Sequence, residues 1–289
     1  MNKIVYFLGA GATKAIAPDA PLNLDLVEKA LKNFGDSDEA KRLVEFIQDV
    51  YHRVDPVIDN QIWNLLDYII QQGKSPSYQI NLEQIKSLRN DLMSLVIQEF
   101  EKSLQNIDVH PYEKFVDKIK HVSTTIISTN YDIIIDNALL TIAKQCNYGT
   151  KMRKVVHPQD FGLTDGFNRP RRTALPNYFN MGRIVLLKLH GSLNWIYCPK
   201  CNEADLTVFS KGAIRTLQGL HCINEYCTSK YESLLITPTM YKDYENRIIK
   251  EIWEYAESAL IEADEVIFIG YALKEEDYQI RSLLMKAML

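Results

Sequence analysis

Short unbroken apolar runs alternate along this chain with longer stretches in which apolar residues recur every three or four positions. Runs of the first kind are typical of strands buried on both faces of a parallel sheet, and the longer stretches are typical of amphipathic helices. The predicted strands are residues 4–8, 122–129, 183–189, 233–237 and 265–269. Strands that alternate with helices predict an α/β fold built on a doubly wound, Rossmann-like parallel sheet.

The helical period also indicates how the chain is divided into domains. It covers residues 23–34, 133–144, 246–262 and 280–287, and it recurs throughout residues 36–110, where no residue suggests chemistry. The pattern therefore predicts a main domain of residues 1–35 and 111–289, with 36–110 as a helical insertion. Residues 146–182 are rich in proline and glycine and predict a loop.

Composition excludes several classes of function. The 289 residues are 46% hydrophobic and 24% charged, which allows a sizeable core, and a net charge of −4 gives no basis for direct nucleic-acid binding. No stretch approaches the ~18 apolar residues of a membrane span, and residues 4–8 are too short for a signal peptide. Five cysteines without a secretory signal favour a reducing, cytoplasmic location and metal binding over disulfides. Basic residues form one cluster, interpreted as a solvated loop or a contact for an anionic partner: Lys151, Arg153, Lys154, Arg169, Arg171 and Arg172.

The first predicted strand leads directly into a glycine turn, Gly9-Ala10-Gly11-Ala12-Thr13. Glycine lets a ligand approach the main chain closely. A helix that begins near Thr13 would direct its free N–H groups at a phosphate. The third glycine of the dinucleotide motif is missing, so an ordinary strand-to-helix turn stays open as an alternative.

Polar groups and glycines also follow three later strands. They are Asn130 and Asp132, then His190 and Ser192, then Gly270 and Tyr271. The carboxyl ends of parallel strands share one edge of a sheet, which is where such sheets bind ligands. A histidine there can act as a general base, an asparagine can orient a water or a ribose, and an aspartate can hold sugar hydroxyls. The alternatives are a structural histidine and a helix cap formed by Asn130 or Asp132.

The cysteine spacing is the most specific signal in the chain. Two pairs, Cys198/Cys201 and Cys222/Cys227, are separated by 20 residues. Such pairs form tetrahedral sulfur sites, so we predict a structural Zn²⁺ in a small module of residues 195–231. Four free buried cysteines are the alternative, His221 is a less favoured ligand, and Cys146 is interpreted as a packing residue.

In this order, the motifs resemble the sirtuin family and, more closely, the divergent bacterial sirtuin-like domains of antiphage defence proteins. The runs that carry the resemblance are Thr129–Asp132, Leu189–Ser192 and Ile269–Asp277, together with the glycine turn and the cysteine pairs. The resemblance implies that the turn holds the NAD pyrophosphate, that Asn130 positions a water or ribose, and that His190 is the base. The resemblance, taken together with the polar residues and glycines at the strand ends, predicts the residues that contact the cofactor. They are Gly9, Ala10, Gly11, Thr13, Asp132, Ser192, Gly270 and Tyr271.

Two features of the sirtuin deacylases are missing from this sequence. No Gly-Ile-Pro-x-Phe-Arg run follows the glycine turn, and residues 237–243 replace the Phe-Gly-Glu stretch that frames acyl-lysine. Both differences favour transfer of ADP-ribose to water, as in an NAD glycohydrolase that is a toxic effector of defence. The alternatives are an NAD-dependent lysine deacylase and a module that senses NAD or ADP-ribose without turnover. A toxic hydrolase needs control, so we expect a homo-oligomer or a regulatory protein partner.

The last predicted helix, residues 280–287, ends without a stop signal. In a doubly wound sheet a crossover helix normally leads to another parallel strand, and the resemblance implies such a strand near the adenine. We therefore expect that Leu289 is not a natural domain boundary. We also expect residues 1–289 alone to bind NAD weakly, with a C-terminal extension restoring the affinity.

Overall fold

The structure, a computed structural model, describes residues 3–22, 25–51, 61–74, 79–157, 168–173, 183–207, 212–237, 246–273 and 277–288. The chain divides into two compact units. The first comprises Met1–Ile16, Ile107–Ile236 and Tyr244–Leu289, and the second comprises Ala17–Asn106 and Thr237–Asp243. The domain boundaries expected at residues 35 and 110 stay a prediction. Most of residues 237–243 lie outside the described part.

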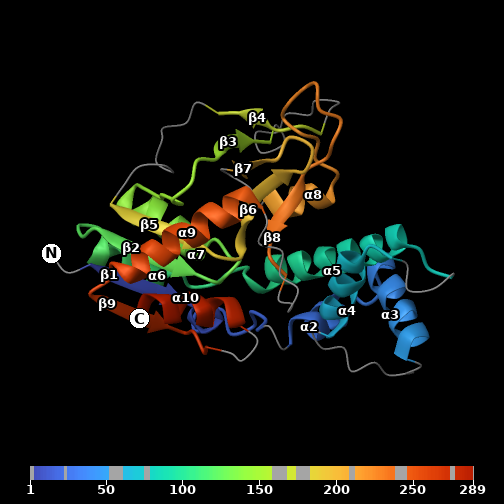
Figure 1. Cartoon of the computed structure of the whole chain (residues 1–289), viewed down its shortest axis with the longest axis horizontal. Helices are drawn as coiled ribbons and strands as arrows, with labels where there is room; N and C mark the ends of the chain where they lie inside the picture. The colour runs from blue at the N-terminus through green and yellow to red at the C-terminus, as the bar shows by residue number, and fades with distance from the viewer. Residues whose placement is uncertain are drawn as a thin grey trace. The chain divides into compact units, whose positions relative to one another are not determined.

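The first unit contains a four-stranded parallel sheet in the order β5-β2-β1-β9 (Figure 1). Its strands are β1 (Ile4–Leu8), β2 (Thr124–Ser128), β5 (Ile184–Lys188) and β9 (Glu265–Ile269). They pair in step, so that Leu8 faces Ser128 on one side and Ile269 on the other. The chain therefore moves outward from β1 through β2 to β5 and then returns to the opposite side of β1. The predicted α/β fold with a parallel sheet is confirmed.

Helices connect the strands of this sheet. They are α6 (His110–Ile119), α7 (Ile134–Ala138) with the π-helix η1 (Leu139–Ala143), and α9 (Arg247–Ile261). A further helix, α10 (Tyr278–Met288), follows β9. Right-handed crossovers place α6 and α7 on one face and α9 on the other. Accordingly, Tyr6 of β1 contacts Phe115 of α6, with the ring centroids 5.0 Å apart. Helix α6 was not predicted from the sequence pattern, although Pro111 in its first turn is a common signal of a helix start.

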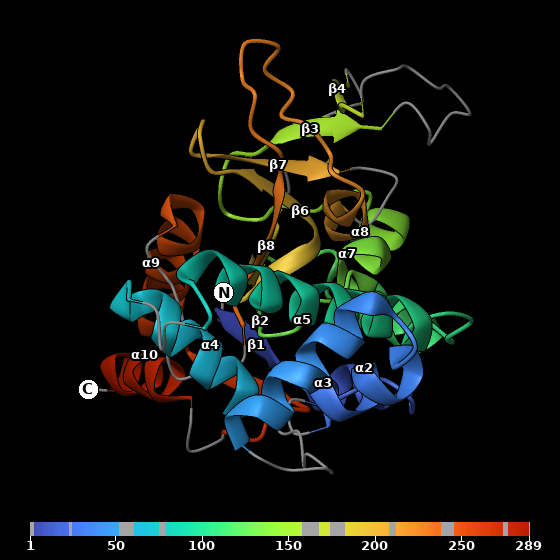
Figure 2. The ribbon, with the colours of Figure 1, turned by 90° about the vertical axis from the view of Figure 1, so that its right-hand side faces the viewer.

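A second sheet in the same unit has the order β4-β3-β7-β6-β8 (Figure 2). Its strands are β4 (Arg171–Arg172), β3 (Arg153–Val156), β7 (Glu203–Thr207), β6 (Gly191–Cys198) and β8 (Glu232–Leu235), with the short helix α8 (Gly212–Leu217).

This sheet corrects two predictions. The strand expected at 233–237 is β8, which pairs antiparallel with β6 and is not part of the parallel sheet. The loop expected at 146–182 contains β3 and β4. A short apolar run shows that a segment is buried but does not show which strand it will pair with.

The second unit is helical, as the sequence pattern indicates. Its helices are α2 (Leu26–Phe34), α3 (Asp38–Tyr51), α4 (Gln61–Gln72) and α5 (Leu82–Ser103), and α5 packs against the other three (Figure 2). Asn81 and Gln84 form a capping box that satisfies the first backbone N–H groups of α5. No helix in the described part of the chain is long and apolar enough to cross a membrane.

At the edge of the parallel sheet, β9 meets the glycine turn after β1. The N–H groups of Gly9 and Gly11 donate to the carbonyls of Ile269 and Gly270 at 3.0 and 2.8 Å. A Cβ on Gly9 would lie 2.5 Å from Tyr271 Cα, and one on Gly270 would overlap the backbone of Ala12. Gly270 also has a φ of 64°, which side-chain-bearing residues rarely adopt. Only glycine fits at this contact.

This contact predicts that Gly270→Ala destabilises the first unit strongly. The left-handed backbone alone costs about 1–2 kcal/mol, and the overlap with Ala12 adds overpacking of about 1–3 kcal/mol. Gly219→Ala is the matched control, since Gly219 has a φ of 73° but only the flexible end of Lys230 nearby. Urea unfolding of both variants measures the difference. Equal losses of stability would show that the β1–β9 contact tolerates a methyl group.

Candidate functional site

The carboxyl ends of β1, β2 and β5 meet at one rim of the parallel sheet. The Thr129 N–H donates to the Leu8 carbonyl at 3.1 Å, and the Leu189 N–H donates to the Ser128 carbonyl at 2.9 Å. The strand order reverses between β1 and β9, and ligands of open α/β sheets bind beside that point. The predicted residues of the rim are therefore brought together by the pairing of the strands themselves.

The helix after β1 begins earlier than expected. It is α1 (Ala10–Lys14), which starts three residues before Thr13, the position considered in the sequence analysis. Gly9 is already extended, with φ −113° and ψ 179°, so it acts as the N-cap and Thr13 lies buried inside the helix. The N–H groups of Gly9, Gly11 and Ala12 all donate to protein carbonyls. In this structure the turn is therefore held by the protein's own hydrogen bonds.

Three side chains on the rim form one chain of hydrogen bonds. The Asn130 amide donates to the Gly9 carbonyl at 2.9 Å and to Thr13 Oγ1 at 3.0 Å. Since a carbonyl only accepts, Asn130 must present its NH₂ group here, which fixes the orientation of the amide. The Thr13 hydroxyl then donates to Asp132 Oδ2 at 2.6 Å.

Asp132 has protein partners on both carboxylate oxygens, because Oδ1 accepts from the Ile134 N–H at 3.0 Å. Ile134 is the first residue of α7, so the helix-capping alternative for Asp132 is present as well. Asp132 thus joins α1 to α7 across the rim.

His190 follows β5 and is buried, with 7% of its surface exposed. Its Nδ1 lies 3.2 Å from the Thr129 carbonyl, one residue before Asn130. A carbonyl accepts only from a protonated nitrogen, so the neutral ring carries its proton on Nδ1 and a lone pair on Nε2. The ring is thus fixed in the tautomer that a general base needs.

Two buried oxygen atoms at the rim have no hydrogen-bond partner in the part of the chain that the structure describes. They are Asn130 Oδ1 and Ser192 Oγ. Buried polar atoms are normally paired, so these two are candidates for ligand contacts. Tyr271 is another of the predicted cofactor contacts. Its ring centroid lies 4.8 Å from that of Phe7, and its hydroxyl donates to Asp277 Oδ2 at 2.9 Å.

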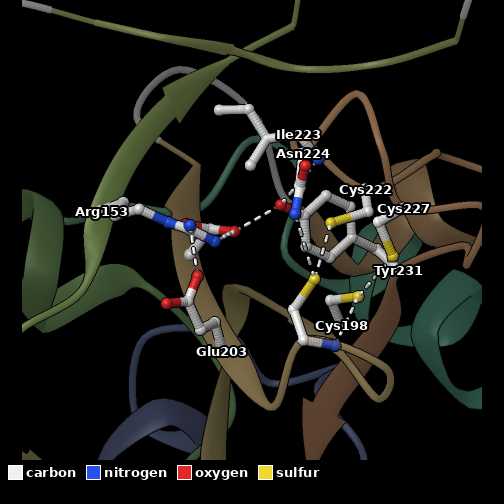
Figure 3. A network of polar contacts seen from close by, with 10 residues as sticks. Arg153, Cys198, Glu203, Cys222, Ile223, Asn224, Cys227 and Tyr231 are labelled. Atoms are coloured by element: carbon white, nitrogen blue, oxygen red, sulfur yellow. Dashed lines mark hydrogen bonds and ion pairs between the residues drawn. The ribbon is translucent and has the colours of Figure 1, made fainter.

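The four cysteines gather in the second sheet, away from the rim residues. Cys198 ends β6 and Cys201 precedes β7, while Cys222 and Cys227 lie in the turns before β8 (Figure 3). All four sulfur atoms lie within 4.8 Å of one another, and the Cys198–Cys227 and Cys201–Cys222 distances are both 3.7 Å. Tetrahedral zinc with Zn–S bonds of about 2.3 Å requires sulfur atoms about 3.8 Å apart. The cluster therefore fits zinc, and His221 is not part of it.

The basic cluster predicted from the sequence is partly neutralised. Arg153 lies on β3, makes a bidentate pair with buried Asp205 at 2.6 and 2.9 Å, and pairs with Glu203 (Figure 3). A pocket of ≈ 510 Å³ lies here, lined by Arg153, Arg172, Cys201, Glu203, Ile223 and Asn224. This pocket adjoins the cysteines and contains none of the rim residues, so it is not the predicted NAD site.

Comparison with known protein families matches residues 124–288 to the SIR2-like domain. The match covers more than half of the chain and includes Asn130, His190, the four cysteines and Gly270. The chain belongs to the SIR2-like family. The resemblance to sirtuins is thereby confirmed, and its narrower placement among bacterial defence proteins stays a prediction.

Two solved sirtuin structures also match this SIR2-like chain. One shows Sir2Tm bound to a propionylated peptide, with 12% identity and a TM-score of 0.36 over 99% of this chain and 77% of that one. The other addresses the structural basis of sirtuin substrate affinity, with 11% identity, the same TM-score and the same coverage. None of the curated proteins compared with the chain matches it.

Sequence reasoning missed a buried polar group beneath the SIR2-like rim. Lys188 and Asp136 are almost fully buried, and Tyr148 and Asn194 continue the group. The sequence signal was Lys188 itself, because it is the one charged residue in the otherwise apolar run of residues 184–189. Cys146 is buried, as expected of a packing residue, and burial raises the pKa of its thiol.

The cysteine geometry predicts one zinc ion per SIR2-like chain. The cysteines belong to a hydrophobic cluster with Val155, Ile196 and Leu220, so losing the metal should loosen the second sheet. Metal analysis of protein purified without chelator should find about one zinc per chain. Cys198→Ser should lower the zinc content and the melting temperature, whereas Cys146→Ser should keep the zinc. Wild-type protein well below one zinc per chain would contradict this assignment.

Proposed function

We propose that this chain is an NAD⁺ glycohydrolase that releases nicotinamide and ADP-ribose. Its membership of the SIR2-like family supports an NAD-dependent activity. The observation that carries the proposal is the fixed orientation of Asn130, whose buried Oδ1 has no partner among the described residues. The carbonyl of the preceding residue, Thr129, accepts from His190 Nδ1, and this tautomer of the ring leaves a lone pair on Nε2.

The proposed hydrolysis of NAD uses Asn130 Oδ1 and His190 Nε2 as follows. The bond between ribose C1′ and the nicotinamide nitrogen breaks, and its electron pair neutralises the pyridinium charge. A water oxygen bonds to C1′, and its proton passes to His190 Nε2. Asn130 Oδ1 holds that water or a ribose hydroxyl, because an acceptor fixed in advance costs no reorganisation during the reaction. The glycine turn, Ser192, Gly270 and Tyr271 would surround the rest of NAD.

Incubating the purified protein with NAD, with and without an acetylated peptide, separates this function from its alternatives. Nicotinamide and ADP-ribose released without peptide support the glycohydrolase. Release that requires the peptide, with loss of its acetyl group, would show a deacylase. Binding measured by calorimetry without any release would show a sensing module.

The site predicts that His190→Ala and Asn130→Ala each lower nicotinamide release about 10²–10⁴-fold, the usual effect of losing a positioned base or water. His157→Ala is the matched control, because His157 is equally buried but bonds Asn168 in the second sheet region. Circular dichroism and melting curves establish that each variant is folded. Near-full turnover by a folded His190→Ala or Asn130→Ala variant would remove the role given to that residue.

We further propose, from the resemblance to defence proteins, that the enzyme is a toxic effector controlled by self-association or by a protein partner. Nicotinamide release per chain should then rise with protein concentration if self-association is the control. Release that is independent of concentration and remains slow would favour a separate partner. Rapid release by the dilute protein alone would contradict control by either route.

A further inference from the structure

A buried charged pair lies directly beneath the rim. Lys188, at the end of β5, has none of its surface exposed, and Asp136, in α7, has 1%. Lys188 Nζ lies 3.4 Å from Asp136 Oδ2 and donates a hydrogen bond to the backbone carbonyl of Asp132. The pair therefore touches the backbone of a residue whose side chain belongs to the rim.

Two further side chains complete the network. The Tyr148 hydroxyl donates to Asp136 Oδ1 and accepts from the Asn194 amide at 3.1 Å. Burial raises the pKa of Asp136, and the charge of Lys188 and the Tyr148 hydroxyl oppose that shift. Burial also raises the pKa of Tyr148 well above its usual value, so the phenol stays protonated and keeps donating. Each side chain thus holds the next in place.

Folding alone does not account for this pair. Two buried charges lose their hydration, and replacing such a pair with apolar residues is often neutral or stabilising. The chain neighbours of Lys188 are all apolar, so a leucine or methionine at this position would suit the same surroundings: Ile184, Val185, Leu186 and Leu187 in β5, and Leu189 after it. Among the described residues, the backbone group to which Lys188 Nζ donates is the Asp132 carbonyl, so we look for the benefit in the position of Asp132.

We propose that Lys188, Asp136 and Tyr148 are positioning residues that fix Asp132 and, through it, Thr13 and Asn130. Lys188 holds Asp132 by its carbonyl, and the Asp132 carboxylate holds the Thr13 hydroxyl, which accepts from the Asn130 amide. The consequence for catalysis, a correctly placed Asn130 Oδ1 at the nicotinamide ribose, rests on the proposed NAD glycohydrolase. The positioning itself is a property of the chain alone.

The first test compares two Tyr→Phe variants. Tyr148→Phe removes the hydroxyl that bonds buried Asp136, and Tyr231→Phe removes a hydroxyl that bonds buried Asp205 in the second sheet. Both lose one buried hydrogen bond to an aspartate, so both should lower the melting temperature. Tyr148→Phe should also lower kcat for nicotinamide release about 10- to 100-fold with little change in KM, because a small misplacement of catalytic groups is costly. Tyr231→Phe should stay within about 2-fold of the wild type. Equal kcat values in the two variants would overturn the proposal.

The second test separates positioning from stability. Lys188→Met alone leaves Asp136 buried without its cation and should destabilise the protein, whereas Lys188→Met combined with Asp136→Leu removes both charges and should recover the melting temperature. A purely structural role predicts that turnover recovers with stability. The proposal predicts that kcat remains about 10- to 100-fold low in the double variant. Recovery of both would overturn it.

A third readout does not depend on NAD cleavage. The Ile134 N–H bonds the Asp132 carboxylate, so its hydrogen exchange reports how firmly Asp132 is held. Exchange at this amide should be at least about tenfold faster in the double variant than in wild type, and unchanged in Tyr231→Phe. Unchanged exchange in the double variant would overturn the positioning role even if the enzyme cleaves NAD. Faster exchange in a protein that releases no nicotinamide would uphold positioning and reject the glycohydrolase instead.

Discussion

The close contact between the backbones of β9 and the glycine turn is the constraint on which the site depends. The turn's N–H groups at Gly9 and Gly11 donate to the last residue of β9, Ile269, and to Gly270 directly after it, and there is no room for a Cβ at Gly9 or Gly270. The contact starts α1 immediately after Gly9 and thereby places Thr13 beside Asn130 and Asp132. It joins the beginning of the chain to its last described strand, at the point where the order of the sheet reverses.

From this contact, one continuous set of hydrogen bonds crosses the rim. It runs from the Gly9 carbonyl through Asn130 and Thr13 to Asp132, and from the Asp132 carbonyl down to Lys188 and Asp136. Because most of these polar groups satisfy one another, Asn130 Oδ1 stands out, since it has no hydrogen-bond partner among the described residues. The proposed hydrolysis, in which the leaving group already carries a positive charge and the nucleophile is water, uses this amide oxygen together with the His190 ring, which is held on the Thr129 carbonyl.

The sequence predicted those parts of the fold that depend on residues close together in the chain. The apolar runs at β1, β2 and β5 correspond to largely buried strands of the parallel sheet, and the spacing of the cysteine pairs predicted the cluster of four sulfur atoms. The run at β9 forms a parallel strand as expected, but it lies at the edge of the sheet and is not buried, with 47% of the Phe268 surface exposed. The placement of polar groups at the carboxyl ends of strands followed from parallel pairing alone. Such features repeat within a few residues, so a single sequence reveals them.

Features that depend on distant partners were not predictable in the same way. The apolar run of β8 does not show that it pairs with β6, and the proline- and glycine-rich stretch around β3 concealed its pairing with β7. The helix start at Ala10 depends on β9, which lies at the other end of the chain. Lys188 is recognisable in the sequence as a charged residue in an apolar run. Its role could not be predicted there, because Asp132 and Asp136 come into contact with it only in the folded unit.

The most direct test of this account is a crystal structure of the His190→Ala variant soaked with NAD, in which a slowed reaction preserves the intact molecule. The account predicts the nicotinamide ribose at the carboxyl ends of β1, β2 and β5, with Asn130 Oδ1 within hydrogen-bond distance of a ribose hydroxyl or of a water facing C1′. It also predicts that the pyrophosphate lies against the glycine turn. NAD bound beside the cysteine cluster, or at the rim with Asn130 turned away from the ribose, would contradict it.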